Sequence, residues 1–425
     1  MDDVRPSGDL ISLLARRLDG HGPLGVAVSG GGDSVALLYR LAEWGRRPLH
    51  VFCVDHGLNP ASGAWTQGVA DHAARVGADF TPLRWTGPKP ATGLSAAARA
   101  ARHALLADAA RAAGVRVLCL AHTRDDVLEA GWMREHGSNV TAPVEWGPSP
   151  AWPQGRGVFL LRPLLDVGRE SLRHYLKARG VGWIDDPANA NPQSLRAQAR
   201  LADKAEPVSI DTPSISRGEM DALLDRRGAA HGLIILRRAA FEALPPAVAH
   251  KVLAAAAVCA GGGDRLPRRD RVEALRSNLA AGMTRTMCGA RIWQDDDYLY
   301  LCREAGDIGR AGTGRVALIP GEEAMWDGRY AIRTDVDGAI EPSGRVRARL
   351  GEADRTLLLR LPPALRGILP VFDEHSPERT LSNARLLGQT AETGVNCVNW
   401  VVPRFVAACG AVDRESRIGL DFAML

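Results

Sequence analysis

The chain has 425 residues, of which 46 % are hydrophobic and 24 % are charged, the balance of a globular protein. A chain of this length corresponds to about two to four domains, each long enough to bury its own core. The net charge of +4 lies wholly within residues 1–205, because acidic and basic residues are equal in number over residues 206–425. All but four of the 53 basic residues are Arg, whose guanidinium group suits bidentate contacts to phosphate.

Several classes of protein are excluded by what the sequence lacks. No run of 18 apolar residues occurs, so we expect no transmembrane helix and no membrane partner. The polar first residues are unlike a targeting peptide. The seven cysteines include no CxxC pair, which indicates reduced thiols of a cytoplasmic protein rather than a structural zinc site or an iron–sulfur cluster. None of the four lysines precedes Ser or Thr, which excludes a Walker-type phosphate loop.

Short apolar runs alternate with helical patterns in the first third of the chain. Unbroken apolar runs separated by helices are typical of buried parallel strands in βαβ units. The pattern predicts an α/β fold with a doubly wound, mostly parallel sheet, and a ligand beyond the carboxyl ends of its strands. Strands are expected at residues 24–28, 49–54, 80–85 and 115–120, and helices at residues 33–44, 62–76, 95–113 and 125–136.

The pattern changes after residue 136. A Gly-, Pro- and Trp-rich stretch at 137–157 predicts a long surface loop, and a strand at 158–162 and a helix at 169–179 complete the first domain. A polar linker is expected at 204–218, followed by a helical pattern over 219–304 and a turn-rich, small α+β or β-rich region after residue 306. We therefore predict three domains, with bounds 1–205, 206–305 and 306–425.

The strongest chemical signal is the string Ser29-Gly30-Gly31-Gly32-Asp33-Ser34, which follows the first strand and opens a helix. Its glycines allow an anion to approach the backbone closely, and the helix start adds N–H groups and partial positive charge. The simpler interpretation is a glycine turn with an Asp/Ser helix cap. The position directly after a buried strand favours phosphate binding.

Two neighbouring carboxylates, Asp125 and Asp126, start a helix at the carboxyl end of another strand. They lie on the same predicted sheet edge as the glycine-rich loop, where they could hold magnesium or an incoming ammonium group. A helix-capping pair is the alternative. Arg99 with Arg102, and Arg196 with Arg200, each share one face of a helix and are either phosphate contacts or solvated residues.

These strings resemble a known family. The loop is similar to the PP-loop, SGGxDS, of ATP pyrophosphatases, which cleave ATP between its α and β phosphates and adenylate an acceptor. Further strings, in family order over about residues 24–200, resemble those of the tRNA(Ile)-lysidine synthases. They are Val54-Asp55-His56-Gly57-Leu58, Ala98-Arg99-Ala100-Ala101-Arg102-His103, Ala121-His122-Thr123-Arg124-Asp125-Asp126, Arg162-Pro163-Leu164-Leu165 and the series Trp183, Asp185-Asp186-Pro187, Asn189, Arg196 and Arg200.

The resemblance implies a reaction and its partners. ATP would adenylate the wobble cytidine of an isoleucine tRNA with a CAU anticodon, and the amine of free L-lysine would displace AMP to give lysidine, so that the tRNA decodes AUA. ATP and magnesium are the implied cofactors, and a homodimer is one oligomeric state that we consider.

The resemblance also implies roles for individual residues. Catalytic roles fall on Asp33, Arg99, Asp125, Asp126 and Arg196. Contacts to ATP fall on Ser29, Gly30, Gly31, Gly32, Asp33, Ser34, Asp55 and His122. Contacts to the other substrates fall on Arg102, Glu129, Asp186, Asn189 and Arg200. Magnesium would lie on Asp33 and Asp125.

The sequence also departs from the family pattern. Val127 and Ala130 replace an amide and a hydroxyl residue of the family's DDQxET string, and Asn139 replaces a glycine. These changes leave open a non-catalytic RNA- or nucleotide-binding protein on a decayed PP-loop scaffold. A thiolating relative is disfavoured by the absence of CxxC, and a glutamine-dependent amidotransferase by the lack of a Cys near the first residues.

The second half of the chain adds one feature. Residues 265–291 hold seven Arg against two acidic residues, a local net charge of +5. This is either a solvated helix face or a surface for RNA, as an extra tRNA-binding domain at 206–305 would supply. Residues 345–349, with Arg at alternate positions, predict a strand with one basic face.

Overall fold

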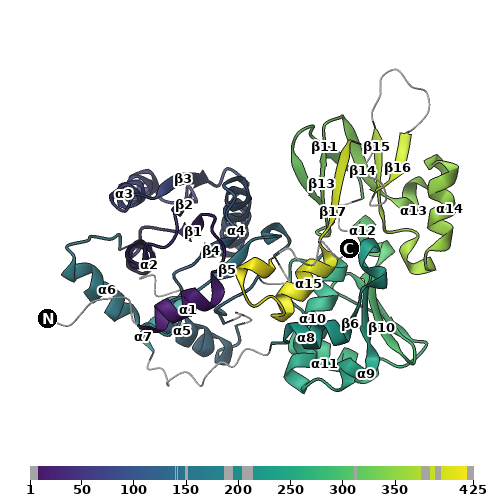
Figure 1. Ribbon diagram of the computed structural model, residues 1–425, viewed down its shortest axis with the longest axis horizontal. Coiled ribbons are helices and arrows are strands. Elements are labelled where there is room, and N and C mark those ends of the chain that lie inside the picture. Colours follow the sequence, from purple (N-terminus) through teal and green to yellow (C-terminus); the bar gives the residue numbers. More distant parts are fainter. Residues whose placement is uncertain are drawn as a thin grey trace. The chain divides into compact units, whose positions relative to one another are not determined.

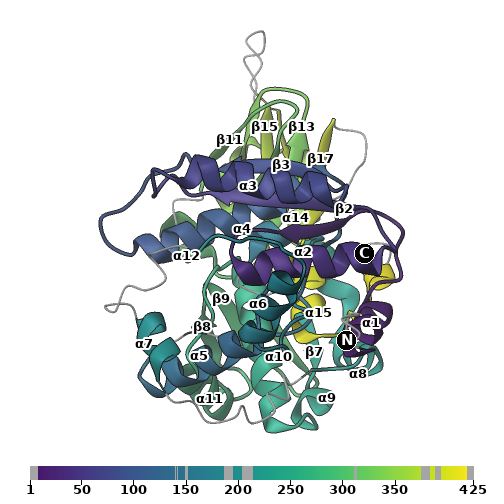
Figure 2. The same cartoon turned by 90° about the vertical axis from the view of Figure 1, so that its left-hand side faces the viewer.

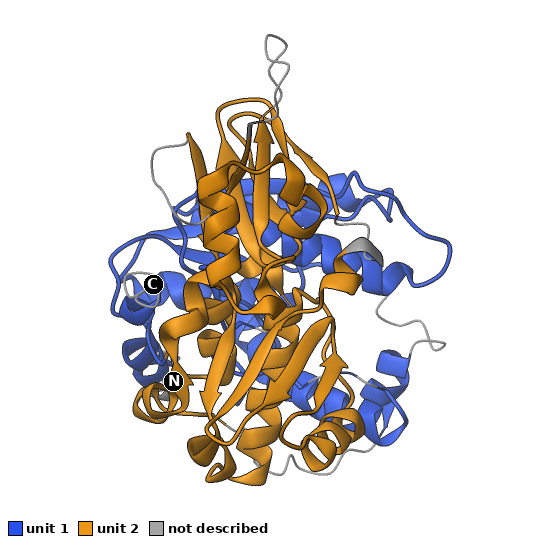
Figure 3. Ribbon diagram, turned by 90° about the vertical axis from the view of Figure 1, so that its right-hand side faces the viewer, with its two compact units in different colours: residues 1–148, 157–212, 413–418 blue, residues 149–156, 213–412, 419–425 orange. Residues whose placement is uncertain are grey.

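The structure is a computed structural model that describes residues 8–138, 140, 142–148, 152–185, 195–202, 214–310, 314–374, 383–387 and 394–418. The chain folds into two compact units, coloured separately in Figure 3. The first comprises residues 1–148, 157–212 and 413–418, and the second comprises residues 149–156, 213–412 and 419–425.

A five-stranded parallel sheet forms the centre of the first unit, with strand order β3-β2-β1-β4-β5 (Figure 1). In this register Val26 lies opposite both Val51 and Cys119, so the middle strand is hydrogen-bonded on both sides. The strands are β1 (Leu24–Ala27), β2 (Leu49–Asp55), β3 (Asp79–Arg84), β4 (Val117–Cys119) and β5 (Phe159–Leu161). The predicted doubly wound parallel sheet is confirmed.

Helices surround this sheet because each strand is followed by an amphipathic crossover. Leu37 and Leu38 of α2 are fully buried, and α2 packs along α6, as Figure 2 shows. The helices of the unit are α1 (Gly8–Arg17), α2 (Gly32–Trp44), α3 (Ser62–Arg75), α4 (Leu94–Ala112), α5 (Arg124–Glu135), α6 (Arg169–Ala178) and α7 (Leu195–Leu201), with a 3-10 turn η6 (Glu415–Arg417). The described residues of the predicted loop at 137–157 are irregular, apart from a one-residue bridge between Trp146 and Leu161 and the short turn η1 (Pro153–Gly155).

The second unit combines helices with three antiparallel sheets. Its strand orders are β6-β7-β10-β9-β8, β11-β14-β15-β16 and β12-β13-β17. The apolar helix α10 (Pro246–Gly261) is buried from Val252 to its last residue and is capped by Gly262, whose φ is +68°. The strands of the first sheet are β6 (Leu224–Asp225), β7 (Ile234–Arg237), β8 (Thr284–Met287), β9 (Ala290–Gln294) and β10 (Tyr298–Arg303).

The other elements of the second unit form its turn-rich part and its short helices. The strands are β11 (Val316–Leu318), β12 (Glu323–Trp326), β13 (Tyr330–Thr334), β14 (Gly338–Pro342), β15 (Pro370–Glu374), β16 (Asn383–Leu386) and β17 (Val395–Asn399). The helices are α8 (Arg217–Leu223), α9 (Arg238–Glu242), α11 (Arg269–Asn278), α12 (Ala305–Arg310), α13 (Ser343–Val346), α14 (Glu352–Arg360) and α15 (Val401–Cys409). The 3-10 turns are η3 (Arg226–His231), η4 (Arg347–Arg349) and η5 (Pro363–Leu365).

Two expectations for this unit need correction. The helical pattern over 219–304 is only part of the structure there, because five short strands, β6 to β10, lie among the helices. The predicted strand at 345–349 is wrong: this segment forms α13 and a 3-10 turn. Arg349 forms ion pairs with Glu341 and Asp373, so one of the three arginines that suggested a basic face is neutralised within the fold. The predicted linker at 204–218 lies mostly outside the described residues.

Candidate active site

The glycine-rich loop joins β1 to α2 at the carboxyl edge of the parallel sheet. The Ser29 N–H donates to Ser34 Oγ at 3.2 Å, and the Ser34 hydroxyl donates to the Gly31 carbonyl at 2.9 Å, so the loop closes on the first turn of α2. Because α2 begins at Gly32, its unpaired N–H groups and the positive end of its dipole lie at this loop. Such an arrangement can bind a phosphate group.

The backbone of the loop requires glycine at one position above all. Gly30 has φ +86°, and a Cβ atom there would lie 2.5 Å from Ile184 Cδ1. The Ile184 N–H also donates to the Gly30 carbonyl at 2.9 Å. The segment around Trp183 and Ile184 therefore packs directly against the loop, which explains why this distant string belongs to the same motif series.

The start of α5 brings carboxylates to the same edge. Thr123 is the N-cap residue, and Asp126 accepts from its N–H at 2.8 Å and from its hydroxyl at 3.0 Å. One turn later, the Glu129 side chain is only 1 % exposed. Asp126 therefore caps the helix and also belongs to a group of four carboxylates, which we call the acidic cluster. The helix-cap and site interpretations of Asp125 and Asp126 are therefore compatible. The acidic cluster consists of Asp33, Asp125, Asp126 and Glu129.

Three arginines hold the acidic cluster together. Arg169 lies at its centre: Nε is 3.0 Å from Asp33 Oδ2, Nη1 is 3.0 Å from Glu129 Oε1, and Nη2 is 3.6 Å from Asp126 Oδ1. The Arg169 N–H also donates to Asp125 at 2.8 Å. The phosphate loop and the acidic end of α5 are thus joined by one side chain.

Arg196 and Arg200, both from α7, complete the ion pairs of Glu129. Arg196 Nε is 3.0 Å from Glu129 Oε2, and its Nη2 pairs with Asp126. Arg200 Nε is 3.1 Å from Glu129 Oε1. A carboxylate as deeply buried as Glu129 needs such partners, because an unpaired charge is costly to bury.

Burial and charge act in opposite directions on these groups. Burial raises the pKa of Asp33 above its usual value, although the Arg169 guanidinium opposes the shift. Burial also works to raise the pKa of Asp126, but the Thr123 N–H and Arg196 outweigh it and hold that pKa low. The Arg169 pKa is raised by Glu129, Asp33 and Asp126 against the effect of burial. The Arg169 guanidinium therefore favours the ionised forms of Asp33 and Asp126, as they favour its own.

A second, basic cluster comes from α4 and from the ends of β4 and β5. Burial lowers the pKa of Arg102 to about 10, with Arg99 acting in the same direction. Burial and the neighbouring Arg162 lower the pKa of His122 to about 3, so this ring is neutral. The Arg162 Nε–H donates to His122 Nδ1 at 3.2 Å, which leaves the ring proton on Nε2. In the part of the chain that the structure describes, neither Arg99 nor Arg102 pairs with a carboxylate.

The remaining sequence-predicted residues are less connected. Asp55, at the end of β2, accepts from the Gly57 N–H at 2.6 Å. Its Oδ2 atom lies 3.9 Å from Nε of the exposed Arg84, and the described structure shows no contact between Asp55 and the acidic cluster. Asp186, Asn189 and Asn139 lie outside the described residues. Two site residues, Arg169 and Arg162, were missed by sequence reasoning. Arg162 does stand within the Arg162-Pro163-Leu164-Leu165 string, whereas Arg169 has no signal beyond its position at a helix start.

A magnesium site was expected on Asp33 and Asp125. Among the described residues, no group of three or more His, Cys, Asp or Glu side chains could hold a metal by itself. Both carboxylates already interact with Arg169. Mg²⁺ in proteins is often bound by only one or two carboxylates, with phosphate oxygens and water as its other ligands. The donor set therefore fits a magnesium ion that arrives with the phosphates of a nucleotide.

All seven cysteines are free thiols. Within the described residues, no helix is both long and apolar enough to cross a membrane.

Comparison with known proteins adds the last observations. A family model described as a PP-loop domain matches residues 9–202. A tRNA(Ile)-lysidine synthase of Caulobacter vibrioides is 40 % identical over 98 % of this chain and 99 % of its own length. Proteins of the same name from Rhizobium meliloti and Ruegeria pomeroyi are 35 % and 34 % identical. Their matches cover 76 % and 81 % of this chain, and 76 % and 84 % of the relatives.

Proposed function

The chain belongs to the tRNA(Ile)-lysidine synthase family, and from this premise we propose how its own residues perform ATP-dependent lysidine formation on tRNA(Ile). The enzyme is a ligase that uses ATP. One observation supports the proposed site most directly: Arg169 joins the phosphate loop to the acidic end of α5, so a nucleotide and an amine can meet there.

The first step needs a bound and oriented ATP. We assign its phosphates to the loop from Ser29 to Ser34 and to the start of α2, with Asp55 at the neighbouring strand end as a further ATP contact. The neutral His122 offers its Nε2–H to a phosphate oxygen, and Arg99 and Arg102 offer guanidinium groups without acidic partners in the described chain. These donors stabilise negative charge as pyrophosphate leaves and the cytidine carbonyl oxygen becomes bonded to AMP.

Magnesium is part of this proposal. Asp33 and Asp125 would hold the ion together with ATP oxygens, and the ion would supply charge neutralisation for the leaving pyrophosphate.

The second step needs a lysine amine that is bound and deprotonated. We propose that free L-lysine is the nucleophile and that Asp126 and Glu129 face its ε-ammonium group, because they are buried carboxylates that Arg169 joins to Asp33 of the phosphate loop. A carboxylate accepts the proton as the amine nitrogen bonds to the cytidine ring carbon and AMP departs. Arg196 and Arg200 balance these carboxylates, and we propose both as contacts to phosphates of ATP or RNA.

Other assignments rest on the same family membership. Asp186 and Asn189 are proposed substrate contacts that lie outside the described residues. The CAU anticodon as the recognised sequence, the cytoplasm as the location, a homodimeric state and three domains with bounds 1–205, 206–305 and 306–425 are further proposals.

Lysine incorporation tests the proposed function. Purified protein is incubated with ATP, tritiated L-lysine and an unmodified isoleucine tRNA with a CAU anticodon, and we expect label in the tRNA and release of one AMP per lysine. A tRNA with another anticodon is the substrate control. Binding of the tRNA without incorporation would instead favour the decayed, non-catalytic alternative that Val127 and Ala130 suggested.

A variant tests the phosphate site within the same assay. Asp33→Ala removes the carboxylate of the loop itself, and we expect AMP release to fall below detection while tRNA binding stays at the wild-type level. Asp71→Ala is the matched control, because Asp71 is an exposed aspartate on α3. Normal turnover by Asp33→Ala would overturn the assignment of the loop.

A further inference from the structure

Two helices of the first unit, α2 and α6, are joined by an ion pair at each end. At their starts Arg169 Nε lies 3.0 Å from Asp33 Oδ2, and at their ends Arg179 Nε lies 2.8 Å from Glu43 Oε1. The partners are ten residues apart in each helix, which is about 15 Å along a helix axis. Because start pairs with start and end with end, the two helices run in the same direction (Figure 2).

An aromatic ring contacts both helices at the end that is remote from Asp33. Tyr175 of α6 is 3 % exposed, and the centroid of its ring lies 3.9 Å from the guanidinium carbon of Arg179. The guanidinium carbon of Arg40, from α2, lies 5.0 Å from the same centroid. These contacts and the nearby ion pair form a group that we call the distal clamp, which consists of Arg40, Glu43, Tyr175 and Arg179.

The stability of the fold does not explain the distal clamp. The side chains of Arg179 and Glu43 are 26 % and 32 % exposed, and a partly exposed ion pair contributes little. Arg40 Nε and Nη1 are buried and have no hydrogen-bond partner among the described residues, which is unfavourable. Leu172 and Leu176 already supply apolar contacts for α6. Apolar contacts allow a helix to shift slightly, whereas directional polar contacts can fix one register.

The register of α6 matters because the helix carries the cations that act on Asp33. Burial raises the pKa of Asp33, Arg169 and Arg173 of α6 work to lower it, and Asp126 of α5 adds to the rise. A shift of α6 along α2 would therefore move both cations relative to the Asp33 carboxylate. The same shift would disturb the contacts of Arg169 with the rest of the acidic cluster.

The end of α6 also leads back to the phosphate loop. The Val181 N–H donates to the Leu176 carbonyl at 3.0 Å as the helix ends, and three residues later the Ile184 N–H donates to the Gly30 carbonyl at 2.9 Å. Arg179 stands directly before this segment. A fixed end of α6 therefore also holds the segment that packs on Gly30.

We propose that the distal clamp positions the active site: it fixes the register of α6 on α2 and thereby holds Arg169 against Asp33. Its members are positioning residues, because they act through Arg169 from the far ends of the two helices. The inference rests on the proposed function, in which Asp33 serves the reaction of ATP. Displacements of about 1 Å that start far from the chemistry can lower a rate strongly, so a clamp of this kind is worth its cost in burial.

Arg179→Ala tests the distal clamp through the pH dependence of AMP release. A loosened Arg169 restrains Asp33 less, so the pKa of Asp33 rises and the acid limb of the kcat–pH profile should move to higher pH. We expect kcat at neutral pH to fall roughly fivefold, with KM for tRNA and the urea midpoint near their wild-type values. Arg179→Lys keeps a cation beside Glu43 and should restore most of the profile. Lys177→Ala, which removes an exposed cation of the same helix, should match the wild type.

The double variant Arg169→Ala/Arg179→Ala separates positioning from general damage. If the distal clamp acts through Arg169, Arg179→Ala should add little further shift of the acid limb once Arg169 is absent. A further shift as large as in the wild-type background would overturn the proposal. So would a lower urea midpoint for Arg179→Ala with an unchanged acid limb, because that result assigns the distal clamp to stability alone.

The titration of Asp33 itself keeps this test separate from the proposed function. Carboxyl-carbon NMR follows Asp33 in the substrate-free protein, and Asp33→Asn identifies its signal. If the wild-type protein makes no lysidine but Arg179→Ala raises the titration midpoint of Asp33, only the proposed function fails. If lysidine forms while Arg179→Ala moves neither the acid limb nor this midpoint, only the proposal for the distal clamp fails.

Discussion

At the scale of single residues, Arg169 is the side chain that joins the phosphate loop to the acidic end of α5. Its guanidinium contacts Asp33, Asp126 and Glu129, and its N–H contacts Asp125. An arginine at the start of a helix has no distinguishing feature in a sequence, because its importance comes from partners 40 to 136 residues away in the chain. Asp33, Asp126 and Glu129 could be predicted because they stand within motifs.

Arg169→Ala should change the pH dependence of the reaction. The pKa of Asp33 is already raised by burial and is restrained by Arg169, so removing the guanidinium raises it further. Activity that needs the Asp33 carboxylate is lost as the pH falls through this pKa. The acid limb of the kcat–pH profile should therefore move to higher pH, and kcat at neutral pH should fall by roughly tenfold or more.

Two further variants complete this test. Arg169→Lys restores a positive charge and should return the acid limb most of the way to the wild-type position. Lys177→Ala, which removes an exposed cation from the same helix, should leave the limb in place. Superimposable profiles for Arg169→Ala and the wild type would show that Arg169 does not control the ionisation of Asp33.

At the scale of elements, the phosphate loop was predictable in kind but not in its packing. A strand, three glycines and a helix start are local features, and they suffice to predict an anion site. The contact of Ile184 with Gly30 joins segments about 150 residues apart and is decided only by the folded structure.

Gly30→Ala tests that contact. The alanine residue would have to adopt a left-handed backbone conformation, and its Cβ atom would lie 2.5 Å from Ile184 Cδ1. We expect a loss of about 2 kcal/mol in the free energy of unfolding from the strain and the overlap together. Gly31→Ala is the structural comparison, since Gly31 has φ −68° and its Cβ would meet only Ser29 Oγ, at 3.6 Å. Urea denaturation measures both variants, and equal stabilities would contradict the role of Ile184.

The strands of the second unit show where element prediction failed. The strands β6 to β10 are two to six residues long, and helical segments separate β6 from β7 and β7 from β8 in the sequence. Their antiparallel partners are set by pairing across the sheet, as between β7 and β10, which are separated by more than 60 residues. A local pattern records propensity, and tertiary pairing overrides it in such short segments.

At the scale of the whole molecule, the chain returns to its first unit after building the second. Residues 413–418 belong to the first unit, where Glu415 forms an ion pair with Arg47; their side chains are 5 % and 4 % exposed. The Ser416 N–H and hydroxyl donate to Asp19 at 2.7 and 2.6 Å. The catalytic unit is therefore completed by a segment from near the far end of the sequence.

Glu415→Ala should destabilise the first unit. Arg47 would be left buried without its carboxylate, a change that costs about 3 kcal/mol. Arg417→Ala, which breaks an exposed pair with Asp413 on the same segment, should cost less than about 1 kcal/mol. Hydrogen exchange of the β1 amides reports the stability of this unit separately from the other. Equal protection in the two variants would show that Glu415 is not needed to complete the unit.

The sequence alone determined the parallel sheet, the phosphate loop, the acidic start of α5 and, through its ordered motifs, the family. These features are encoded locally: hydrophobic periodicity predicts strands and helices, and glycines or carboxylates at strand ends predict a site at one sheet edge. Net charge left nucleic acid optional, because the average hid the arginines of residues 265–291.

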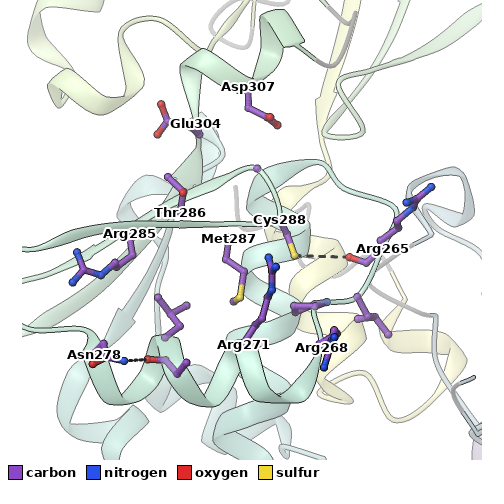
Figure 4. Close-up of a pocket in the computed structure, with 15 residues that line it drawn as sticks. Arg265, Arg268, Arg271, Asn278, Arg285, Thr286, Met287, Cys288, Glu304 and Asp307 are labelled. Atoms are coloured by element: carbon purple, nitrogen blue, oxygen red, sulfur yellow. Dashed lines mark hydrogen bonds between the residues drawn. The ribbon is translucent and has the colours of Figure 1, made fainter. Parts of the chain in front are cut away.

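Only the tertiary structure decided which of these residues act together. It joined Asp33, Asp126 and Glu129 through Arg169, and it placed the ring proton of His122 on Nε2 through Arg162. It placed four of the seven arginines of residues 265–291 along one groove (Figure 4). It also returned residues 413–418 to the first unit. The physical reason is the same in each case: ion pairs, burial and pKa depend on distances in space between groups far apart in the chain, and no local pattern contains them.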